Sequence, residues 1–226
     1  MKTVTPGFEV MLGKIDGMLI LQSIERAGRT CYKSEDKITP DSSGRFVAML
    51  IERGHESVLE HAAVTVRIIC DRGVSHELVR HRIASYSQES TRYCTYDQGI
   101  QVIQPFFFDD NEAGVPRLLP DGENVLPLNK ALVWSMAMQV CEWAYLSLLA
   151  MGAAPQEARS VLPNSLKTEI VVTMNLREWR HFFKLRTAPA AHPQMREIAV
   201  PLLEKFQEAI PVVFDDIPGS PAKAQP

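Results

Sequence analysis

The stretch Arg80–Tyr93 reads Arg-His-Arg-Ile-Ala-Ser-Tyr-Ser-Gln-Glu-Ser-Thr-Arg-Tyr. It places three arginines, one histidine, three serines and two tyrosines within fourteen residues. An arginine guanidinium presents a fixed fork of donors that matches phosphate and carboxylate oxygens, and serine hydroxyls with backbone N–H groups can complete such a cradle. Most short basic runs are solvated turns. Because hydroxyls and aromatic rings alternate with the charges here, the stretch also fits an anion-binding site, and both interpretations stay open.

Length and composition are those of a soluble globular protein. The 226 residues suit one domain with a sizeable core, which we predict to span residues 1–217, followed by a disordered tail at 218–226. Hydrophobic residues make up 46% of the chain and charged residues 23%, which is ordinary for this class. The net charge of −3 argues against broad nucleic-acid binding, which needs a basic face.

The N-terminus and the cysteines predict a cytoplasmic location. Residues 1–6 contain no apolar signal segment. The four cysteines lie far apart and form no C-x-x-C pair, so we expect free thiols in a reducing compartment; they are Cys31, Cys70, Cys94 and Cys141. Cys94 follows the Arg80–Tyr93 stretch, but no histidine close to it in sequence would activate it as a nucleophile.

Periodicity and turn residues predict a mixture of helices and strands. Helices are expected at residues 17–32, 40–53, 73–79, 128–151, 155–162, 175–186 and 197–210. Strands are expected at residues 63–70, 100–107 and 168–174. The polar, acidic segment 109–123 is predicted to be a loop or flap. This pattern indicates a single-domain α+β fold.

The predicted helix at 128–151 is apolar on almost every side. Gln139 and Glu142 lie near its middle and no basic flank follows it, so we do not expect it to span a membrane. A helix of this kind in a soluble protein must be buried. In so small a chain, burial against a second copy is a plausible solution.

The segment His55–His61 contains two histidines and two glutamates, which raises the question of a metal site. Its spacing matches neither H-E-x-x-H nor H-x-x-E-H, and a polar cluster at a helix end explains it as well. A metal-dependent hydrolase using His55, Glu60, His61 and His81 remains one alternative. A non-catalytic nucleotide-binding module is another.

Arg80-His81-Arg82, followed after seven residues by Ser90 and then by Arg92-Tyr93, resembles the signature of the flavin-dependent thymidylate synthases. The similarity runs from about residue 55 to about residue 196. Its other parts are a His-x-Ser-x-x-Glu-His element, a Glu-Ala-Arg before Leu-Pro, and an Asn-x-Arg with a histidine four residues on; they contain His55, Ser57, Glu60, His61, Glu157, Arg159, Asn175, Arg177 and His181.

The resemblance implies a fold and a reaction. The fold is a mostly antiparallel sheet packed with helices, including one long buried helix. The reaction is the reductive methylation of dUMP to dTMP, with 5,10-methylenetetrahydrofolate as the carbon donor, NADPH-reduced FAD as the hydride source and tetrahydrofolate as a product. The family works as a homotetramer with sites shared between subunits, and no metal, nucleic acid or membrane is implied.

The resemblance also implies the site residues. Flavin contacts are expected from His55, Ser57, Arg80, His81, Arg82, Ile83, Gln88, Asn175, Arg177 and His181. Contacts with dUMP are expected from Glu77, Arg80, Gln88, Glu89, Ser90, Thr91, Arg92, Arg159 and Arg186. Arg186 matches the arginine that stabilises the ionised N3 of uracil and is the expected catalytic residue. For Ser90 a nucleotide-binding role is preferred to that of a covalent nucleophile.

Three positions depart from the family pattern. Glu77 stands where many members have Gln, Gln88 where many have Glu, and His181 where some have Asn. The first two changes together leave the number of carboxylates unchanged.

Overall fold

The structure, a computed structural model, describes residues 1–11, 13–109, 111, 113–118 and 125–219. All but the first two residues of the predicted tail at 218–226 therefore lie outside the described residues. The chain forms two compact units that interleave along the sequence. The first unit holds residues 1–6, 69–76 and 88–169, and the second holds residues 7–68, 77–87 and 170–226.

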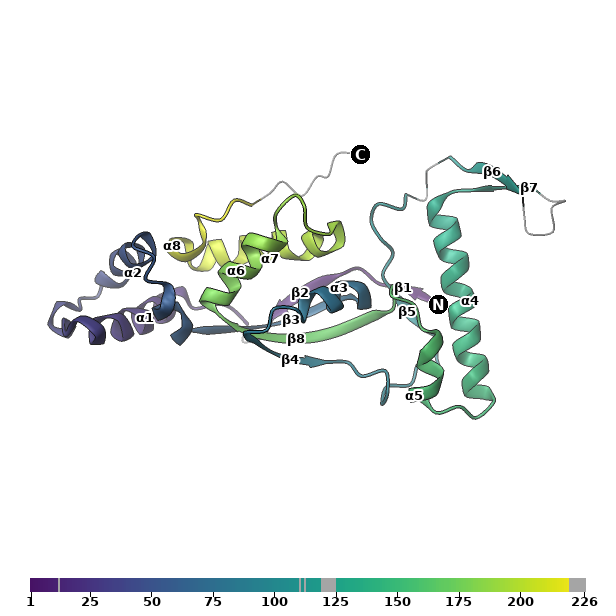
Figure 1. The fold of residues 1–226 in the computed structure, drawn as a ribbon, viewed down its shortest axis with the longest axis horizontal. Helices are drawn as coiled ribbons and strands as arrows, with labels where there is room; N and C mark the ends of the chain where they lie inside the picture. The colour runs from purple at the N-terminus through teal and green to yellow at the C-terminus, as the bar shows by residue number, and fades with distance from the viewer. Residues whose placement is uncertain (12, 110, 112, 119–124, 220–226) are drawn as a thin grey trace. The chain divides into compact units, whose positions relative to one another are not determined.

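A four-stranded sheet runs mainly through the second unit (Figure 1). Its order is β2-β3-β8-β4, with strands β2 (Gly7–Val10), β3 (Ala63–Asp71), β8 (Lys167–Asn175) and β4 (Ala84–Gln88). Strands β3 and β8 confirm the two predicted strands that are richest in β-branched residues. Strand β4 lies within the Arg80–Tyr93 stretch, where no strand was predicted. Its Ala-Ser-Tyr-Ser-Gln sequence alternates between half-buried and exposed positions, as a strand requires.

Strands β3 and β8 run antiparallel. The N–H of Leu176 bonds to the carbonyl of Ala62, and the hydroxyls of Thr65 and Thr173 lie 2.9 Å apart. The partner's residue number falls as the number along β3 rises, which is the antiparallel pattern. Branched side chains alternate with polar ones along both strands, so one face of this pair is buried.

The rest of the second unit is mainly helical. Its helices are α1 (Gly17–Tyr32), η1 (Glu35–Lys37), α2 (Ser42–Glu52), η2 (Glu56–His61), α6 (Leu176–Arg186), α7 (Pro193–Ala209) and α8 (Pro211–Phe214). The predicted helix at 197–210 begins four residues earlier, because Pro193 occupies a first-turn position that tolerates proline. An aromatic cluster forms the core between α6, α7 and α8; its rings belong to Trp179, Phe182, Phe183, Phe206 and Phe214, all fully buried.

The first unit is built around a long helix. Its elements are β1 (Lys2–Thr3), β5 (Gln101–Val102), β6 (Val115–Leu118), β7 (Val125–Leu128), α4 (Lys130–Ala150), α5 (Pro155–Ala158) and η3 (Arg159–Val161). Helix α3 (Arg72–Leu78) and β3 pass from one unit into the other. The buried core of this unit consists of Ile100, Val102, Met138, Tyr145, Ala158 and Leu166.

Two predictions in this unit need correction. The segment 109–123 is not a loop throughout, because 115–118 pair antiparallel with 125–128. The strand predicted at 100–107 is reduced to Gln101–Val102, which pairs in parallel with Lys2–Thr3. Phe106 and Phe107, which suggested a longer strand, are 47% and 43% exposed instead.

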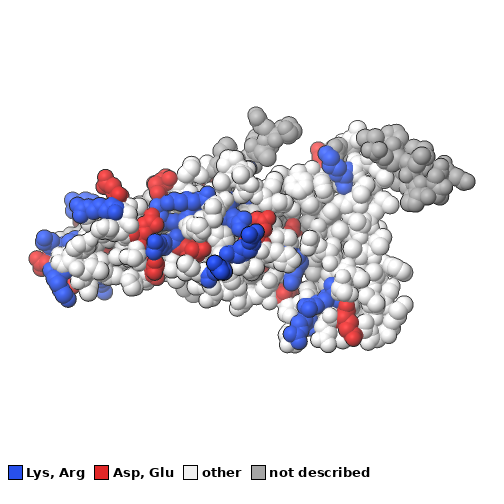
Figure 2. Space-filling model, in the orientation of Figure 1, with Lys and Arg blue, Asp and Glu red and all other residues white. Residues whose placement is uncertain are grey.

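Helix α4 is only partly buried by the described residues, with Ala131, Met138 and Tyr145 in the core, and the predicted burial against a second copy is not tested by one chain. Its side chains include exposed apolar ones at Val133, Val140 and Trp143, the last of them 70% exposed. The surface along α4 is almost free of charge in Figure 2. Length and composition alone would let α4 cross a membrane, a test that core helices of soluble proteins also pass. The helix therefore presents a broad apolar surface that the described residues leave exposed.

Candidate functional site

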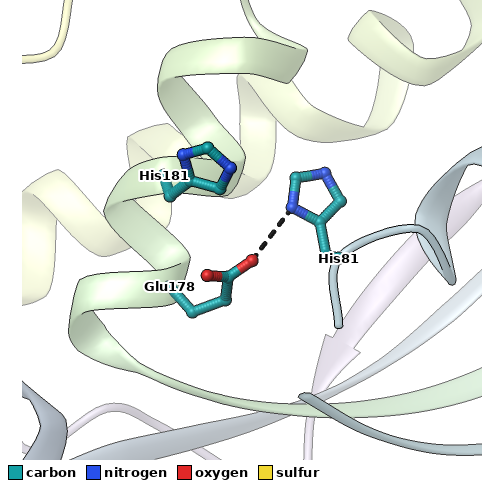
Figure 3. Close-up of side chains that lie close together, drawn as sticks. All are labelled: His81, Glu178 and His181. Carbon is teal, nitrogen blue, oxygen red and sulfur yellow. Dashed lines mark hydrogen bonds and ion pairs between the residues drawn. The ribbon is translucent and has the colours of Figure 1, made fainter. Parts of the chain in front are cut away.

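His81 lies buried at the centre of a hydrogen-bonded chain in the second unit. Its Nδ1 is 3.1 Å from Oε1 of Glu178, and its Nε2 accepts a hydrogen bond of 3.0 Å from Nε of Arg186. Figure 3 shows the His81 ring facing the Glu178 carboxylate, with the ring of His181 beside them. The centroids of the two histidine rings are 5.6 Å apart.

The environment of His81 favours the neutral imidazole. Burial lowers its pKa, and the positive charge of Arg186 acts in the same direction, while the hydrogen bond to Glu178 acts against both. An arginine is always protonated, so its Nε–H is a donor and the facing Nε2 must carry a lone pair. The remaining proton of a neutral ring is then on Nδ1, which donates to Glu178.

Arg186 is held from two sides. Besides the bond from Nε to His81, Nη1 donates to Oε2 of Glu77 at 2.8 Å and Nη2 donates to the backbone oxygen of Glu77 at 3.1 Å. A guanidinium has five N–H groups. Three are engaged, which leaves two (5 − 3 = 2) for a ligand. The side chain retains 17% of its accessible surface, so it is not sealed from the neighbouring cavity.

Helix α6 positions three of these groups because of how it begins and packs. Oδ1 of Asn175 accepts a hydrogen bond of 2.9 Å from the N–H of Glu178, which makes Asn175 the N-cap. Trp179, Phe182 and Phe183 are fully buried and anchor α6 in the core. The remaining face carries Glu178 and, one turn later, the exposed His181.

Tyr86 fixes the turn that carries His81. Its hydroxyl lies 2.8 Å from the carbonyl oxygen of Leu78 and 2.7 Å from that of His81. Burial raises the pKa of Tyr86 to about 12, so the hydroxyl stays protonated and can donate. Tyr86 therefore stabilises the backbone of the turn that carries His81.

Two open cavities flank α6 in the second unit, with volumes of about 680 and 470 Å³. The larger is lined by Arg80–Ile83, Leu185 and Arg186, among others. The smaller is lined by Glu56, Glu60, Asn175, Arg177 and Arg180, among others. Ile83, Glu178, His181 and Lys184 line both. Most of the predicted flavin contacts thus gather around one helix.

The larger cavity has cations at its rim and an apolar surface. Among the residues described, no ion pair engages the side chain of Arg80, Arg82 or Lys184. Ile83 is 68% exposed, which is unusual for a large apolar side chain. Unpaired cations beside exposed apolar surface suit a ligand that combines phosphates with a flat ring.

A separate cavity of about 470 Å³ lies in the first unit. Its lining includes Arg72, His76, Thr91 and Arg159. Nη1 of Arg72 donates to the backbone oxygen of Glu89 at 3.2 Å, so this guanidinium is fixed in place. Of the residues predicted to contact dUMP, Thr91 and Arg159 line this cavity. The two arginines give it the donors that an anion needs.

Other predicted nucleotide contacts are tied to protein groups in the first unit. The amide nitrogen of Gln88 donates to Oγ of Ser75 at 2.9 Å and to Oγ1 of Thr168 at 3.2 Å. The carboxylate of Glu89 accepts from Tyr96 at 2.8 Å and pairs with Lys167 at 3.3 Å. Ser90 accepts the N–H of Arg92 at 3.3 Å in a local turn, and Arg92 and Tyr93 are exposed.

The His55–His61 segment forms the short helix η2. The ring of His55 bonds the hydroxyl of Tyr32 at 3.0 Å, and both His55 and Ser57 are exposed. Glu60 pairs with Arg177 at 2.6 Å. These contacts bring two of the predicted motifs together at the smaller cavity. They engage Glu60 with a cation rather than directing it toward the other ligands of the hypothetical hydrolase.

Potential metal ligands meet elsewhere, at His81, Glu178 and His181, whose ligand atoms lie within 4.8 Å of one another. Both ring nitrogens of His81 already have protein partners, one of them the cationic Arg186. A metal ion would have to displace one of these partners and approach a positive charge. The donor set therefore fits a hydrogen-bonded assembly better than a cation site.

The sequence analysis missed Glu178, Lys184, Arg72 and His76. Glu178 was detectable, because it lies three residues before His181 and so shares its helix face. Lys184 lies three residues after His181 on the same face. Arg72 and His76 had no such signal, because their cavity is formed by segments distant in sequence.

Comparisons with known proteins converge on one family. Residues 18–212 match the family model described as thymidylate synthase complementing protein. A protein named flavin-dependent thymidylate synthase from Geobacter sulfurreducens is 37% identical over 201 residues, covering 86% of this chain and 80% of its own length. One of the same name from Mycolicibacterium vanbaalenii is 38% identical over 200 residues, covering 85% and 78%.

A solved structure has the same fold. It is a UMP/dUMP methylase, PolB, from Streptomyces cacaoi bound with 5-Br dUMP, and it superposes with a TM-score of 0.72 at 23% identity. The match covers 95% of this chain and 96% of that chain. The predicted fold class, a mixed helix-and-sheet protein with an antiparallel sheet, is thereby confirmed.

Proposed function

Since this chain belongs to the thymidylate synthase complementing protein family, we propose that it catalyses the reductive methylation of dUMP to dTMP. The carbon donor is 5,10-methylenetetrahydrofolate, the hydride comes from FAD reduced by NADPH, and tetrahydrofolate is released. The enzyme is an FAD-dependent methyltransferase.

The observation that carries this proposal is the arrangement of Arg186. Carbon 5 of uracil is a poor nucleophile, and ionising or polarising the ring raises its electron density. A guanidinium fixed in advance stabilises the negative charge that develops on the ring without reorganising during the reaction. Three anchoring hydrogen bonds fix Arg186, and two N–H groups remain available at the larger cavity.

The residues around the larger cavity fit a flavin dinucleotide. Arg80, Arg82 and Lys184 supply cations for a diphosphate, and Ile83 supplies an apolar surface for a ring. Asn175, Arg177 and His181 extend this surface to the smaller cavity, next to η2, which bears Ser57 and directly follows His55. FAD, when bound, carries the hydride and the one-carbon unit, so the protein's task is to bind and align.

We propose that dUMP is contacted by Glu77, Arg80 and Arg186, and by the segment 88–92 and Arg159. Thr91, Arg159 and Arg72, which line one cavity, offer donors suited to the nucleotide phosphate. We also propose that residues 1–217 act as one catalytic domain.

We propose a homotetramer whose sites are shared between subunits. The exposed apolar side chains of α4 support this, because a monomer rarely leaves so continuous an apolar surface in water. All four cysteines are free thiols, which fits a reducing cytoplasm.

The first test is the visible absorption spectrum of the purified protein, repeated after anaerobic addition of NADPH with and without dUMP. We expect a flavin spectrum that bleaches, and bleaches faster with dUMP. No flavin, even after incubation with FAD, would favour a non-catalytic nucleotide-binding module instead. Stoichiometric zinc or iron in the purified protein would favour the metal-dependent hydrolase.

The second test is Arg186→Ala, assayed for dTMP formation. We expect the variant to retain flavin and to lose turnover by about 100-fold or more, because a preorganised donor to a developing charge is typically worth that much. A matched control is Lys205→Ala, which removes an exposed cation on α7 that pairs with Glu208. Turnover of Arg186→Ala at the wild-type rate would refute the role of Arg186.

A further inference from the structure

We propose that Glu178 is a positioning residue for the reaction, holding His81 in the tautomer whose Nε2 accepts the hydrogen bond from Arg186. This inference rests on the proposed function, in which Arg186 acts on the uracil. Glu178 itself belongs to none of the motifs in the family resemblance.

Four side chains form one continuous chain of hydrogen bonds. Glu178 bonds to His81 at 3.1 Å, His81 bonds to Arg186 at 3.0 Å, and Arg186 bonds to Glu77 at 2.8 Å. A carboxylate thus stands at each end, and the guanidinium is held between an imidazole and a carboxylate. Glu178 acts on Arg186 only through the ring of His81.

Arg186 determines which nitrogen of His81 donates and which accepts. Nε of Arg186 always carries its proton, so the facing nitrogen of His81 must be an acceptor. In the other tautomer, or in the imidazolium, an N–H of His81 would face the N–H of Arg186. Such an arrangement has no hydrogen bond and would push the guanidinium away. Hydrogen bonding at the second ring nitrogen selects the tautomer, and Glu178 is the group in that position.

The carboxylate of Glu178 and the ring of His81 are both held in place. Glu178 is only 7% exposed, and its backbone N–H is fixed by the N-cap Asn175 at the start of α6. The His81 ring also packs edge-on against Phe182, with centroids 5.1 Å apart. Glu178 therefore has little freedom to leave His81, and His81 has little freedom to rotate.

The proposal is tested first by the nitrogen chemical shifts of His81. The protein, purified with its flavin, is labelled with ¹⁵N-histidine, and the His81 signals are assigned with His81→Gln. We expect a protonated, pyrrole-type Nδ1 and an unprotonated, pyridine-type Nε2 at pH 7. A protonated Nε2, or protonation of both nitrogens, would overturn the proposal. Added Zn²⁺ should leave both signals in place; a shift of Nδ1 or Nε2 on stoichiometric binding would show a metal site instead.

The kinetic test compares two substitutions at the same position. Glu178→Gln keeps an oxygen that can accept the Nδ1–H of His81, whereas Glu178→Leu has a similar size and no acceptor. We expect kcat for dTMP formation to fall about 10- to 100-fold in Glu178→Leu, as for the loss of a charge-assisted hydrogen bond, and to be largely restored in Glu178→Gln. Glu208→Leu, a change at an exposed glutamate of α7, is the control and should match wild type.

The outcomes separate this inference from the proposed function. Equal loss in Glu178→Gln and Glu178→Leu would show that the charge of Glu178, not its role as an acceptor, matters, and wild-type turnover in Glu178→Leu would also overturn the proposal. Thermal unfolding of both variants identifies a folding defect, in which case the nitrogen shifts of the wild-type protein decide. If wild type forms no dTMP, the proposed function fails, but those shifts still test the tautomer.

Discussion

The ion pair between Arg180 and Asp216 should make a measurable, pH-dependent contribution to stability. Arg180 is 2% exposed, and its two terminal nitrogens each lie 2.7 Å from an oxygen of Asp216. The same guanidinium pairs with Glu56 at 3.2 Å and bonds to the carbonyl of Val213. One buried cation thus connects α6 with η2 and with the segment after α8.

The expected cost of Asp216→Asn follows from these contacts. Breaking a fully buried pair costs about 3–5 kcal/mol, because it leaves a buried charge uncompensated. Here Asp216 is 51% exposed and Glu56 remains as a partner, so the cost should be smaller. We expect about 1.5–3 kcal/mol, the range for hydrogen bonds to charged groups. For a chain of this size, each kcal/mol lowers Tm by about 2–4 °C.

The pH dependence has a definite sign. Hydrogen bonds from Arg180 hold the pKa of Asp216 below its usual value. A carboxyl with a depressed native pKa contributes stability that is fully present above its unfolded pKa, about 3.9, and is lost as the pH falls through the native pKa. Wild type and Asp216→Asn should therefore differ most at neutral pH and converge in acid.

Urea unfolding at pH 7 and at a series of acidic pH values, at fixed protein concentration, measures both quantities. Asp215→Asn is the matched control, because Asp215 is exposed and, among the described residues, its side chain makes no ion pair. If Asp216→Asn costs no more than Asp215→Asn at pH 7, the stabilising role of this pair is wrong. A difference in unfolding free energy between wild type and Asp216→Asn that stays constant into strong acid would contradict the predicted effect of protonating Asp216.

Three further predictions concern local packing and chemistry. Gly28→Ala should lower stability by about 1–3 kcal/mol, because the new Cβ would lie 2.7 Å from an aromatic ring atom of α2. By contrast, Gly44→Ala, with nothing within 4 Å, should raise stability by about 0.5–1 kcal/mol; thermal unfolding compares the two. Burial raises the pKa of Cys70 to about 12, so in the native protein iodoacetamide should modify the exposed Cys31 long before Cys70, as peptide mass spectrometry would report. Tyr86→Phe removes the hydroxyl that closes the turn at His81 and should cost about 1–3 kcal/mol, measured by urea unfolding, with no loss expected if the two carbonyls find other donors.

The sequence predicted the elements whose cause is local. Helix α1 begins and ends at the predicted residues, because Asp16 caps its first turn and Lys33 leaves the helix in a left-handed conformation. Strand β8 and helix α6 follow each other directly in the sequence, and both were predicted because the spacing of the hydrophobic residues changes at Asn175. In each case the signal lies within the element itself.

The elements that were missed depend on partners distant in sequence. Strand β4 lies in a polar stretch and is a strand because it joins the edge of the sheet at β8, about 80 residues later. The pair β6 and β7 contains Pro116 and Pro127, residues that argue against strands when only one segment is considered. Helix α4 was placed correctly, but many of its apolar side chains are exposed among the described residues.

The candidate site, like the fold, was predicted where the signal is local and missed where it depends on residues distant in sequence. Arginines and hydroxyls in Arg80–Tyr93 indicated anion binding from residue chemistry alone, but nothing in their spacing connected His81 with Arg186, 105 positions later. The family resemblance assigned both residues to the site, but only the structure shows the hydrogen bond between them. Spacing along α6 could have added Glu178, because it shares a helix face with His181, yet only the structure pairs it with His81.

The two carboxylates beside Arg186 and His81 determine what the arginine can contribute. Glu77 forms an ion pair with Arg186 at 2.8 Å, so the positive charge of Arg186 is partly balanced before any ligand binds and its long-range attraction for the nucleotide is weakened. Arg186 then contributes through the orientation of its donors, because the guanidinium is fixed and two of its N–H groups are free at a cavity. A fixed donor favours the species whose charge develops at that position, and substrate and transition state then differ in how well they match it. On this argument, a glutamine at position 77 would strengthen binding of the anionic nucleotide while loosening the orientation of Arg186. Comparing dUMP affinity and kcat in Glu77→Gln tests this: opposite changes in the two quantities support it, and parallel changes contradict it.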